Sequence, residues 1–405
     1  MTLNLRPAAL RERAFRRFFA GYTTSLLGSS MASIAVTFAV LQTGGGGTQL
    51  GCVLAARILP LVLVLLLGGV VGDRLGSRRV MLTADAVRCL TQTGLALAFL
   101  GGSAELWTLI ALVAVWGAAE ALFTPALNAL VPGIAPGGGL SDANALLGMA
   151  RSATSIAGPV LAGLMITAAG ASSVLALDAG SYAVSVTALL LLPSTVRPSP
   201  RASSFAADLR EGWTEFRSRT WLWVTSLHVG LFNLLVWAPF LVLGPVVAQR
   251  SLGGATAWGL VMALYGAGAV IGGLLMLGRR PRRPLFVATA ATLGWALPSA
   301  ALATGRPLPW ICAAALLAGV GSALSGTLYT TATQAQVPPR TLARISAYST
   351  FGAFALGPVG LAAAGPLSVL VGTSSVLGFG AVWQLAAALA VLTLPAIRVA
   401  VPQRA

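Results

Sequence analysis

Long apolar runs alternate with short polar segments along the whole chain. Each run has about 20 residues or more, the length that crosses a bilayer as an α-helix. We therefore expect an all-α integral membrane protein. Its twelve predicted spans cover residues 18–42, 49–72, 79–101, 105–131, 142–168, 172–193, 221–248, 256–277, 284–304, 308–333, 343–365 and 373–395.

The longest polar interruption lies between the sixth and seventh spans. Residues 194–204 are rich in Pro, Ser and Arg, a composition typical of a linker. Residues 205–219 then show a helical period, which predicts an amphipathic helix on the cytoplasmic membrane surface; a merely solvated linker is the alternative. The apolar face of this helix would carry Phe205, Leu209, Trp213 and Phe216.

The interruption divides the chain into two predicted six-helix bundles. The N-terminal bundle covers 1–193, the cytoplasmic linker 194–220 and the C-terminal bundle 221–405. The halves also echo each other: Gly158-Pro159 has a counterpart in Gly357-Pro358, and segment 69–79 has one in 273–283. Internal repeats of this kind build transporters from two bundles, so we expect pseudo-twofold symmetry between them.

The composition excludes a soluble protein. The chain is 57% hydrophobic and 9% charged, whereas soluble domains carry about 25% charged residues. A net charge of +16 could indicate a nucleic-acid partner, but the arginines lie in short loops between apolar runs. Three arginines fall within spans and two in outer loops, while the other 21 lie at the termini and in loops of one side. This asymmetry predicts that both termini are cytoplasmic and that no nucleic acid is bound.

Several classes of site are absent from the sequence. The three cysteines and the single histidine are scattered, which predicts neither a disulfide nor a metal site. A phosphate-binding loop with Lys-Ser/Thr is also lacking, so ATP is not the expected energy source. The chain begins without a short apolar segment and cleavage site, so the first span is expected to be retained. We expect no enzyme activity and no cofactor.

One charged turn stands between the second and third spans, with the sequence Gly69-Val-Val-Gly-Asp73-Arg74-Leu-Gly76-Ser-Arg78-Arg79. This G-x-x-x-D-R-x-G-x-R-R pattern, the twelve spans and the division into two halves resemble the major facilitator superfamily over essentially the whole chain. Shorter segments look like bacterial drug-type and siderophore-type exporters of that family. They are Phe15-Arg-Arg-Phe18, Phe123-Thr-Pro125-Ala126, Ala143-Asn144-Ala145-Leu146 and Gly158-Pro159-Val-Leu-Ala-Gly163.

The chain also departs from the family pattern. The antiporter-like motif of the fifth span keeps Gly158, Pro159 and Gly163, but other glycines of that motif are replaced by Ala150, Thr154 and Ala162. The fourth span has Glu120 and lacks the arginine of many drug/proton antiporters. In the second copy of the loop motif, Leu277 stands opposite Asp73. Proton antiport is therefore implied by the resemblance without a complete signature.

The resemblance implies a conformational latch at the charged turn, formed by Gly69, Asp73, Arg74, Gly76, Arg78 and Arg79. Asp73 lies near a helix C-terminus, where the dipole disfavours an acid, so it needs a donor. In the family this aspartate holds the N-terminal half to the eleventh span, which here begins near Arg340 and Arg344. The alternative is a loop that only sets the topology.

Glu120 is the sharpest functional candidate because it lies near the middle of the fourth span. Ionisable groups at that depth are costly and mark functional sites. Trp116 and Thr124 lie one turn before and after it, on the same face. We expect Glu120 to bind a proton or a cationic substrate group; the alternative is a carboxyl satisfied by a neighbouring helix.

The other charged residues of the spans have weaker functional signals. Asp85 and Arg88 are spaced to neutralise each other. Arg57 either faces a cavity or extends to the interface, and Arg151 could pair with Asp178 or Asp142. His228 reads as a satisfied interfacial residue, with a proton relay as the alternative.

Polar stripes run along the spans in which the family places its substrate, namely the first, fourth, seventh and tenth. The stripe residues are Tyr22, Ser25 and Ser29 in the first span, Asn233 and Trp237 in the seventh and Tyr329 in the tenth. Helix packing is the competing explanation for the small hydroxyls. The aromatic residues favour a cavity for mixed apolar ligands.

The sequence thus predicts a monomeric secondary transporter of a bacterial inner membrane. It would export a small amphipathic compound, such as a drug, siderophore or natural product, by alternating access coupled to proton influx. Its partners would be the small-molecule substrate, protons and membrane lipids. The alternatives are an uptake transporter for a nutrient or metabolite, and a transporter-like membrane sensor that moves no substrate.

Overall fold

The computed structural model describes residues 8–65, 76–102, 105–135, 139–192, 213–276, 279, 281–337 and 339–398. The chain forms two compact units, of which the first consists of Met1–Gly44 and Ala56–Arg201 and the second of Gly45–Ala55 and Ala202–Ala405. The first turns of α2 thus belong to the second unit. The predicted division into two six-helix bundles stays a prediction.

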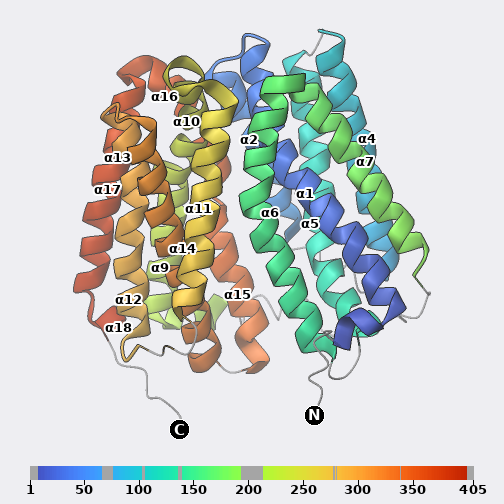
Figure 1. The fold of residues 1–405 in the computed structure, drawn as a ribbon. Helices are drawn as coiled ribbons and strands as arrows, with labels where there is room; N and C mark the ends of the chain where they lie inside the picture. Colours follow the sequence, from blue (N-terminus) through green and yellow to red (C-terminus); the bar gives the residue numbers. More distant parts are fainter. Residues whose placement is uncertain are drawn as a thin grey trace. The chain divides into compact units, whose positions relative to one another are not determined.

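Helices make up the first unit, drawn from blue to green in Figure 1. They are η1 (Ala8–Arg11), α1 (Arg13–Gln42), α2 (Gly47–Leu65, shared with the second unit), α4 (Ser77–Leu100), α5 (Leu106–Ile134), α6 (Gly139–Ala169) and α7 (Ala171–Leu190). Helix α1 packs on α6 and α7, and α4 packs between α5 and α7. An apolar core that includes Phe15, Phe18 and Met81 joins these helices.

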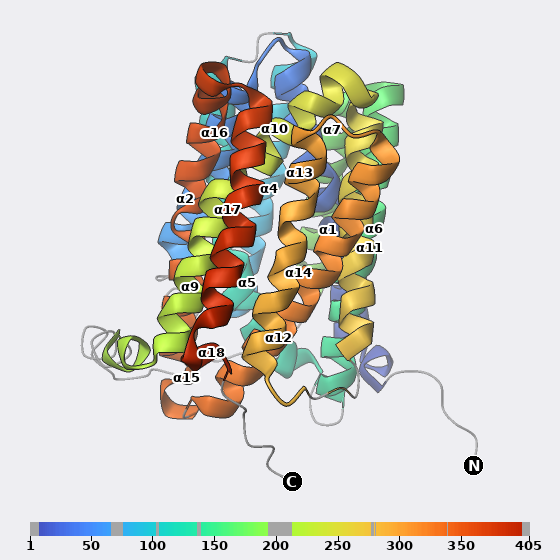
Figure 2. The same cartoon turned by 90° about the vertical axis from the view of Figure 1, so that its left-hand side faces the viewer.

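The described part of the second unit is also helical, and Figure 2 shows several of its helices from the front. They are α9 (Thr220–Phe232), η2 (Asn233–Trp237), α10 (Ala238–Val247), η3 (Ala248–Leu252), α11 (Gly254–Met276), α12 (Pro284–Ala291), η4 (Thr292–Trp295), α13 (Ala296–Ala303), α14 (Leu308–Gln336), α15 (Pro339–Phe354), α16 (Gly357–Val371), α17 (Thr373–Thr393) and α18 (Pro395–Arg398). Its tightest pairing is α11 on α14, where Gly268 lies against the Leu316 carbonyl and Gly319 against the Tyr265 carbonyl. Small residues allow such close backbone approach in a membrane.

Ten helices of the described part are long and apolar enough to cross a membrane. Two helices are not among the ten. One is α2, after which residues 66–75 lie outside the described part, and the other is α4, which carries Arg78, Arg79, Asp85 and Arg88. The prediction of twelve spans therefore stays a prediction, and the end of the second span at residue 72 lies outside the described residues.

Three predicted spans are interrupted where the sequence predicted continuous helices. The seventh widens into π-helical turns at η2 and η3, the ninth tightens into a 3₁₀ turn at η4, and the eleventh breaks between α15 and α16. Pro239, Pro298 and Pro358 follow η2, η4 and the break between α15 and α16, respectively. Proline has no N–H for the carbonyl one turn earlier and disfavours helical geometry in the residue before it, which explains these three irregularities.

Two connections show the same geometry in the two halves of the sequence. A single glycine joins α6 to α7, and another joins α16 to α17. Gly170 has φ +80° and Gly372 has φ +89°, a backbone conformation that side chains other than glycine rarely adopt. Each glycine follows a helix that carries one of the matching Gly-Pro pairs, Gly158-Pro159 or Gly357-Pro358. The local chain geometry thus repeats along with the sequence.

Of the amphipathic helix predicted at 205–219, residues 213–219 are described, and 213–218 are helical. Phe216 is buried in a core with Trp221, Leu222 and Leu285. Trp213 is 48% exposed and stacks on Phe216 at 5.9 Å between ring centroids. The apolar face therefore packs on protein at Phe216; residues 205–212 lie outside the described part.

Candidate functional site

Glu120 of α5 forms an ion pair with Arg57 of α2 in the first unit. Arg57 donates from Nη2 and Nε to Glu120 Oε2 at 2.9 and 3.2 Å, and from Nη1 to Ser33 Oγ of α1 at 2.8 Å. The two helices approach closely here because Gly117 has no side chain and lies against the Arg57 carbonyl. The side chains of Arg57 and Glu120 are 20% and 33% exposed, so both remain partly accessible.

Trp116 lies beneath this pair. The Arg57 guanidinium carbon is 3.8 Å from the centroid of the Trp116 ring, which is a cation–π contact. The indole Nε1 donates to Tyr182 Oη of α7 at 3.1 Å, and Tyr182 Oη also shares a hydrogen bond of 2.8 Å with Ser29 of α1. Buried contacts from three helices therefore fix the platform on which Arg57 lies.

Asp85 and Arg88 of α4 form a second ion pair, as their spacing predicted. Arg88 Nη2 lies 2.6 Å from Asp85 Oδ1, and Ser185 Oγ of α7 donates to Asp85 Oδ2 at 2.6 Å. The Arg88 guanidinium also faces the rings of Phe123 and Tyr182, at 4.1 and 4.8 Å. Because both charges are buried and paired, loss of either partner would leave an uncompensated charge between α4, α7 and α5.

The polar stripe of the first span makes contacts with its own helix and its neighbours. Ser25 donates to the Tyr22 carbonyl at 3.1 Å, and Ser29 to the Ser25 carbonyl at 2.7 Å. Tyr22 is buried, stacks on Phe123 and accepts a hydrogen bond of 2.9 Å from Arg151 Nε. These contacts are those of helix packing, which was the competing interpretation. Thr124, one turn beyond Glu120, is exposed.

The charged turn is only partly within the described residues. Gly69, Asp73 and Arg74 lie outside them, and so do the side chains of Arg340 and Arg344. Gly76, with φ +83°, precedes α4, and Arg79 is exposed. Arg78 donates to the carbonyls of Leu189 and Leu190 at 2.9 and 2.8 Å, so it caps the C-terminal end of α7.

The antiporter-like motif of α6 lies at a helix–helix contact. Gly158 and Pro159 are buried, and Gly158 lies against Ser30 of α1, whose hydroxyl donates to the Thr154 carbonyl at 3.0 Å. Gly163 is buried as well, and its carbonyl accepts from Thr167 at 2.9 Å. In this structure the motif allows α6 to approach α1 closely.

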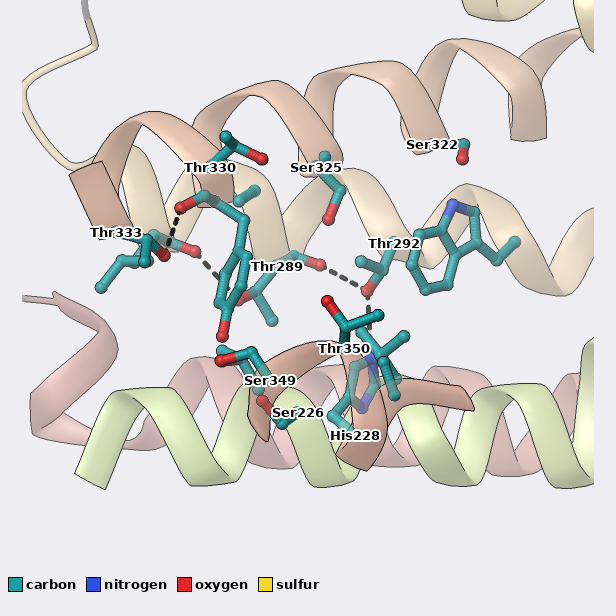
Figure 3. A pocket seen from close by; sticks show the side chains of 18 of the residues that line it. Ser226, His228, Thr289, Thr292, Ser322, Ser325, Thr330, Thr333, Ser349 and Thr350 are labelled. Carbon is teal, nitrogen blue, oxygen red and sulfur yellow. Dashed lines mark hydrogen bonds between the residues drawn. The ribbon is translucent and has the colours of Figure 1, made fainter. Parts of the chain in front are cut away.

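A cavity of ≈ 510 Å³ lies within the second unit (Figure 3). Its walls come from α9, α12, η4, α14 and α15. Figure 3 shows Ser226 and His228 on one side and Ser322, Ser325 and Thr330 on the opposite side. The described lining residues are hydroxyl-bearing, aromatic and aliphatic, with one histidine and one glutamine, and none of them is an arginine or an acid.

Several lining groups have no hydrogen-bond partner among the described residues. They are the hydroxyls of Ser226 and Ser349, Nε1 of Trp295 and Nδ1 of His228. Buried polar groups without partners are rare because each costs free energy. These groups are therefore available to a ligand that carries hydrogen-bonding atoms.

His228 is part of the cavity wall. It is 6% exposed and stacks on Trp383 at 6.1 Å between ring centroids. Its Nε2 is 3.4 Å from both Thr292 Oγ1 and Gln384 Nε2, and Gln384 in turn donates to the Thr292 carbonyl at 3.0 Å. These neighbours fix the ring so that Nδ1 remains without a partner.

The remaining predicted cavity residues are Tyr329, Trp237 and Asn233, and of these three Tyr329 lines the large cavity. Tyr329 meets Trp221 edge to face. Trp237 lines a much smaller cavity of ≈ 10 Å³, where it packs against Tyr265. Asn233 is buried and donates to the carbonyls of Val229 and Ala353 at 3.1 and 2.9 Å, so it joins α9 to α15.

Sequence reasoning missed much of the cavity. The ninth span supplies Thr289, Thr292 and Trp295, and the eleventh supplies Ser349. Both lie outside the first, fourth, seventh and tenth spans, in which the family places its substrate. The signal in the ninth span was the spacing of Thr289, Thr292 and Trp295 by three residues, which places them on one helix face. Arg57 as the partner of Glu120 had no local signal, since 63 positions separate them.

Comparisons with known proteins show relatives over most of the chain. The multidrug efflux pump Tap of Mycobacterium tuberculosis is 28% identical over 388 residues, which cover 92% of this chain and 91% of that protein. Macrolide efflux protein A of Streptococcus pyogenes is 24% identical over 279 residues, covering 67% and 69%. A single-residue variant of the nucleoside transporter NupG has the same fold, with a TM-score of 0.77 at 14% identity, over 94% of this chain and 99% of NupG. The family model of the Major Facilitator Superfamily matches residues 18–361, and the chain therefore belongs to this superfamily.

Proposed function

We propose that this protein is a secondary transporter that exports small amphipathic compounds across a bacterial cytoplasmic membrane. Two relatives that match most of the chain are named as efflux pumps, one for multiple drugs and one for macrolides. The mechanism would be alternating access between two bundles, with proton influx as the energy source. Protons and the substrate would be its small partners, and lipids would surround a monomer.

The cavity of the second unit is the observation that carries this proposal. Its volume of ≈ 510 Å³ lies within the range of about 300–1,000 Å³ that is usual for drug-sized ligands. Hydroxyls and aromatic rings line it together, and the described lining side chains include no arginine or acid. Such a wall suits a partly apolar molecule with several oxygen atoms. A multiply charged nutrient would find no opposite charge among these side chains, which disfavours the uptake alternative.

The partly exposed Arg57–Glu120 pair is the candidate coupling element. In this conformation Arg57 neutralises Glu120, so a proton or a cationic substrate group would have to displace the guanidinium. The carboxylate would then lose two charge-assisted hydrogen bonds, and Arg57 would keep its contacts with Ser33 and Trp116. Protonation of Glu120 would thus release α5 from α2.

The orientation and the latch belong to the same proposal. The arginine-rich loops favour cytoplasmic termini. Asp73, which lies outside the described residues, would latch the cytoplasmic side together with Gly69, Arg74, Gly76, Arg78 and Arg79. If Asp73→Asn leaves the balance between inward-facing and outward-facing states unchanged in distance-labelling experiments, the latch is refuted.

Counterflow in proteoliposomes tests whether the protein transports. Vesicles preloaded with unlabelled erythromycin, a macrolide, should accumulate the radiolabelled compound transiently. Ser325→Leu should weaken this exchange at least tenfold, because the new side chain projects into the cavity. Thr331→Leu is the matched control: Thr331 is on the same helix, is exposed and does not line the cavity.

The outcomes separate the possible functions. Exchange that is lost in Ser325→Leu and kept in Thr331→Leu supports transport through this cavity. Binding of erythromycin without exchange would contradict transport and support the membrane-sensor alternative. Exchange that both variants preserve would refute the role of the cavity.

A further inference from the structure

Away from the ends of four helices of the first unit, α2, α4, α5 and α7, the described acids outnumber the bases. There these helices carry Arg57 and Arg88 but also Asp85, Glu120 and Asp178. Arg57 pairs with Glu120 and Arg88 pairs with Asp85. Asp178 of α7 forms no ion pair with a described residue, so it is the acid left over.

Asp178 is enclosed by protein and poorly satisfied. It is 0% exposed, and its Oδ1 accepts one hydrogen bond from Ser181 Oγ at 3.1 Å. Its Oδ2 has no partner among the described residues. On the side of α1, Gly28 lies directly against Oδ1 of Asp178 and Oγ of Ser181, so there is no room for a further side chain.

The register of α4 and α7 places the buried side chain of Gln92 at the level of Asp178. Asp85 contacts Ser185, and one turn along, Arg88 faces Tyr182. Since these helices are antiparallel, the same register continues to Gln92 and Asp178, two turns from the first contact. Gln92 is also 0% exposed, and neither its Oε1 nor its Nε2 has a partner among the described residues.

A charged Asp178 would be costly at this position. An ionised carboxylate in an apolar interior needs a cation or several donors, whereas a carboxylic acid needs far less. The charged and titratable groups that act on it are Arg88 on α4, Arg57 on α2, Glu120 on α5 and Tyr182 on α7. Both arginines of this set are already held in ion pairs, Arg57 by Glu120 and Arg88 by Asp85.

We propose that Asp178 is a proton-carrying acid of the transport cycle, which holds its proton in this conformation while Glu120 stays ionised in its pair with Arg57. This inference rests on the proposed proton coupling and assigns the bound proton to a residue. Gln92, at the same level of α4, makes no hydrogen bond to Asp178 in this conformation. Its amide carries an acceptor for the acid proton and a donor for a carboxylate, so after a small movement of α4 against α7 it would suit both forms of Asp178. Release would transfer the proton from the Asp178 carboxyl to water and leave a carboxylate, once α1, α4 and α7 separate enough to admit water.

A chemical label tests the location of the proton without any variant. Dicyclohexylcarbodiimide reacts with protonated carboxyl groups in apolar surroundings and leaves an N-acylurea on the acid. Because Asp178 is enclosed in this conformation, the purified protein is treated at pH 7 while it exchanges erythromycin and its helices move. The adduct should then form on the peptide that contains Asp178, as detected by mass spectrometry. An adduct on Glu120 with Asp178 unmodified would overturn the assignment.

Transport by Asp178→Asn tests the role of the proton. Asparagine resembles the protonated acid in shape, so the variant should fold and exchange erythromycin in counterflow within about twofold of the wild type. It should lose accumulation against a gradient when a pH difference is imposed. Asp178→Glu keeps an acid and should recover part of this accumulation, and Glu105→Gln, at an exposed acid, is the matched control.

The results distinguish two failures. Wild-type protein that exchanges erythromycin but ignores the pH gradient would overturn proton coupling, and this inference with it. Wild-type protein that responds to the gradient, beside Asp178→Asn with the same accumulation and pH profile, would overturn the role of Asp178 alone. In the latter case Asp178 and Gln92 only pack α4 against α7.

Discussion

The Arg57–Glu120 pair makes a quantitative prediction for stability. We consider Glu120→Gln, Arg57→Met and the double variant in a double-mutant cycle. Exposed ion pairs contribute about 0.2–1 kcal/mol, whereas breaking a fully buried pair costs about 3–5 kcal/mol. The side chains are 20% and 33% exposed, which places this pair between the two cases. We therefore expect a coupling of about 1–2 kcal/mol, or about 5–30-fold in an equilibrium constant.

The contacts of Arg57 also predict an asymmetry between the single variants. Arg57→Met loses the contact with Trp116 and the hydrogen bond to Ser33 as well as the ion pair. Glu120→Gln loses the charge of the acid and keeps both of these contacts. The arginine variant should therefore be less stable than the glutamate variant by about 1 kcal/mol, the magnitude of a partly desolvated cation–π contact.

Reversible unfolding in mixed detergent micelles, followed by tryptophan fluorescence, measures these free energies. Glu105 is exposed and directly precedes α5, the helix that carries Glu120, so Glu105→Gln controls for the loss of an acid at an exposed position. The effects of independent sites add to within about 0.5 kcal/mol, so a coupling smaller than this is indistinguishable from zero. Such a value would show that the pair contributes nothing to the native state and would refute the role given to it.

Three further variants probe other contacts. Tyr182→Phe removes two interhelical hydrogen bonds, those of the Tyr182 hydroxyl with the Trp116 indole N–H and with Ser29. Such bonds average about 0.6 kcal/mol each in membranes, so the free energy of unfolding should fall by about 1 kcal/mol, and an unchanged value would contradict the assigned bonds. Gly268→Leu should destabilise the α11–α14 crossing by about 1–3 kcal/mol or more, because its side chain meets a backbone carbonyl, whereas Gly273→Leu enters open space and should be neutral in the same unfolding assay. Trp295→Phe should weaken erythromycin binding about 2–12-fold through loss of one hydrogen bond, as measured by equilibrium dialysis, with unfolding unchanged; equal affinity would remove Trp295 from the binding site.

Local features of the sequence predicted part of the site. Asp85 and Arg88 are one turn apart on one helix, so their pairing follows from helix geometry alone. Glu120 could be recognised as unusual because an acid in an apolar run is rare. Its partner could not be chosen, because that choice depends on which helices pack together and on the close approach that Gly117 allows.

The shape of the helices limited prediction of the cavity. The sequence suggested straight spans, but proline interrupts the helices at η2, at η4 and between α15 and α16. The cavity lies among these interrupted segments and includes Thr292 and Trp295 of η4 itself. A periodic stripe assumes regular helices and therefore gives a weak signal where the helix is irregular.

The proposed coupling is tested most directly by substrate accumulation in inverted membrane vesicles under an imposed pH gradient, with an acidic interior. Wild-type protein should concentrate radiolabelled erythromycin above the passive trapping of this weak base in vesicles that lack the protein, and this excess should be lost when an ionophore collapses the gradient. Glu120→Gln should only equilibrate the compound, because its side chain can no longer exchange a proton for Arg57. Accumulation by Glu120→Gln at the wild-type rate and with the same pH dependence would contradict the coupling role of this pair.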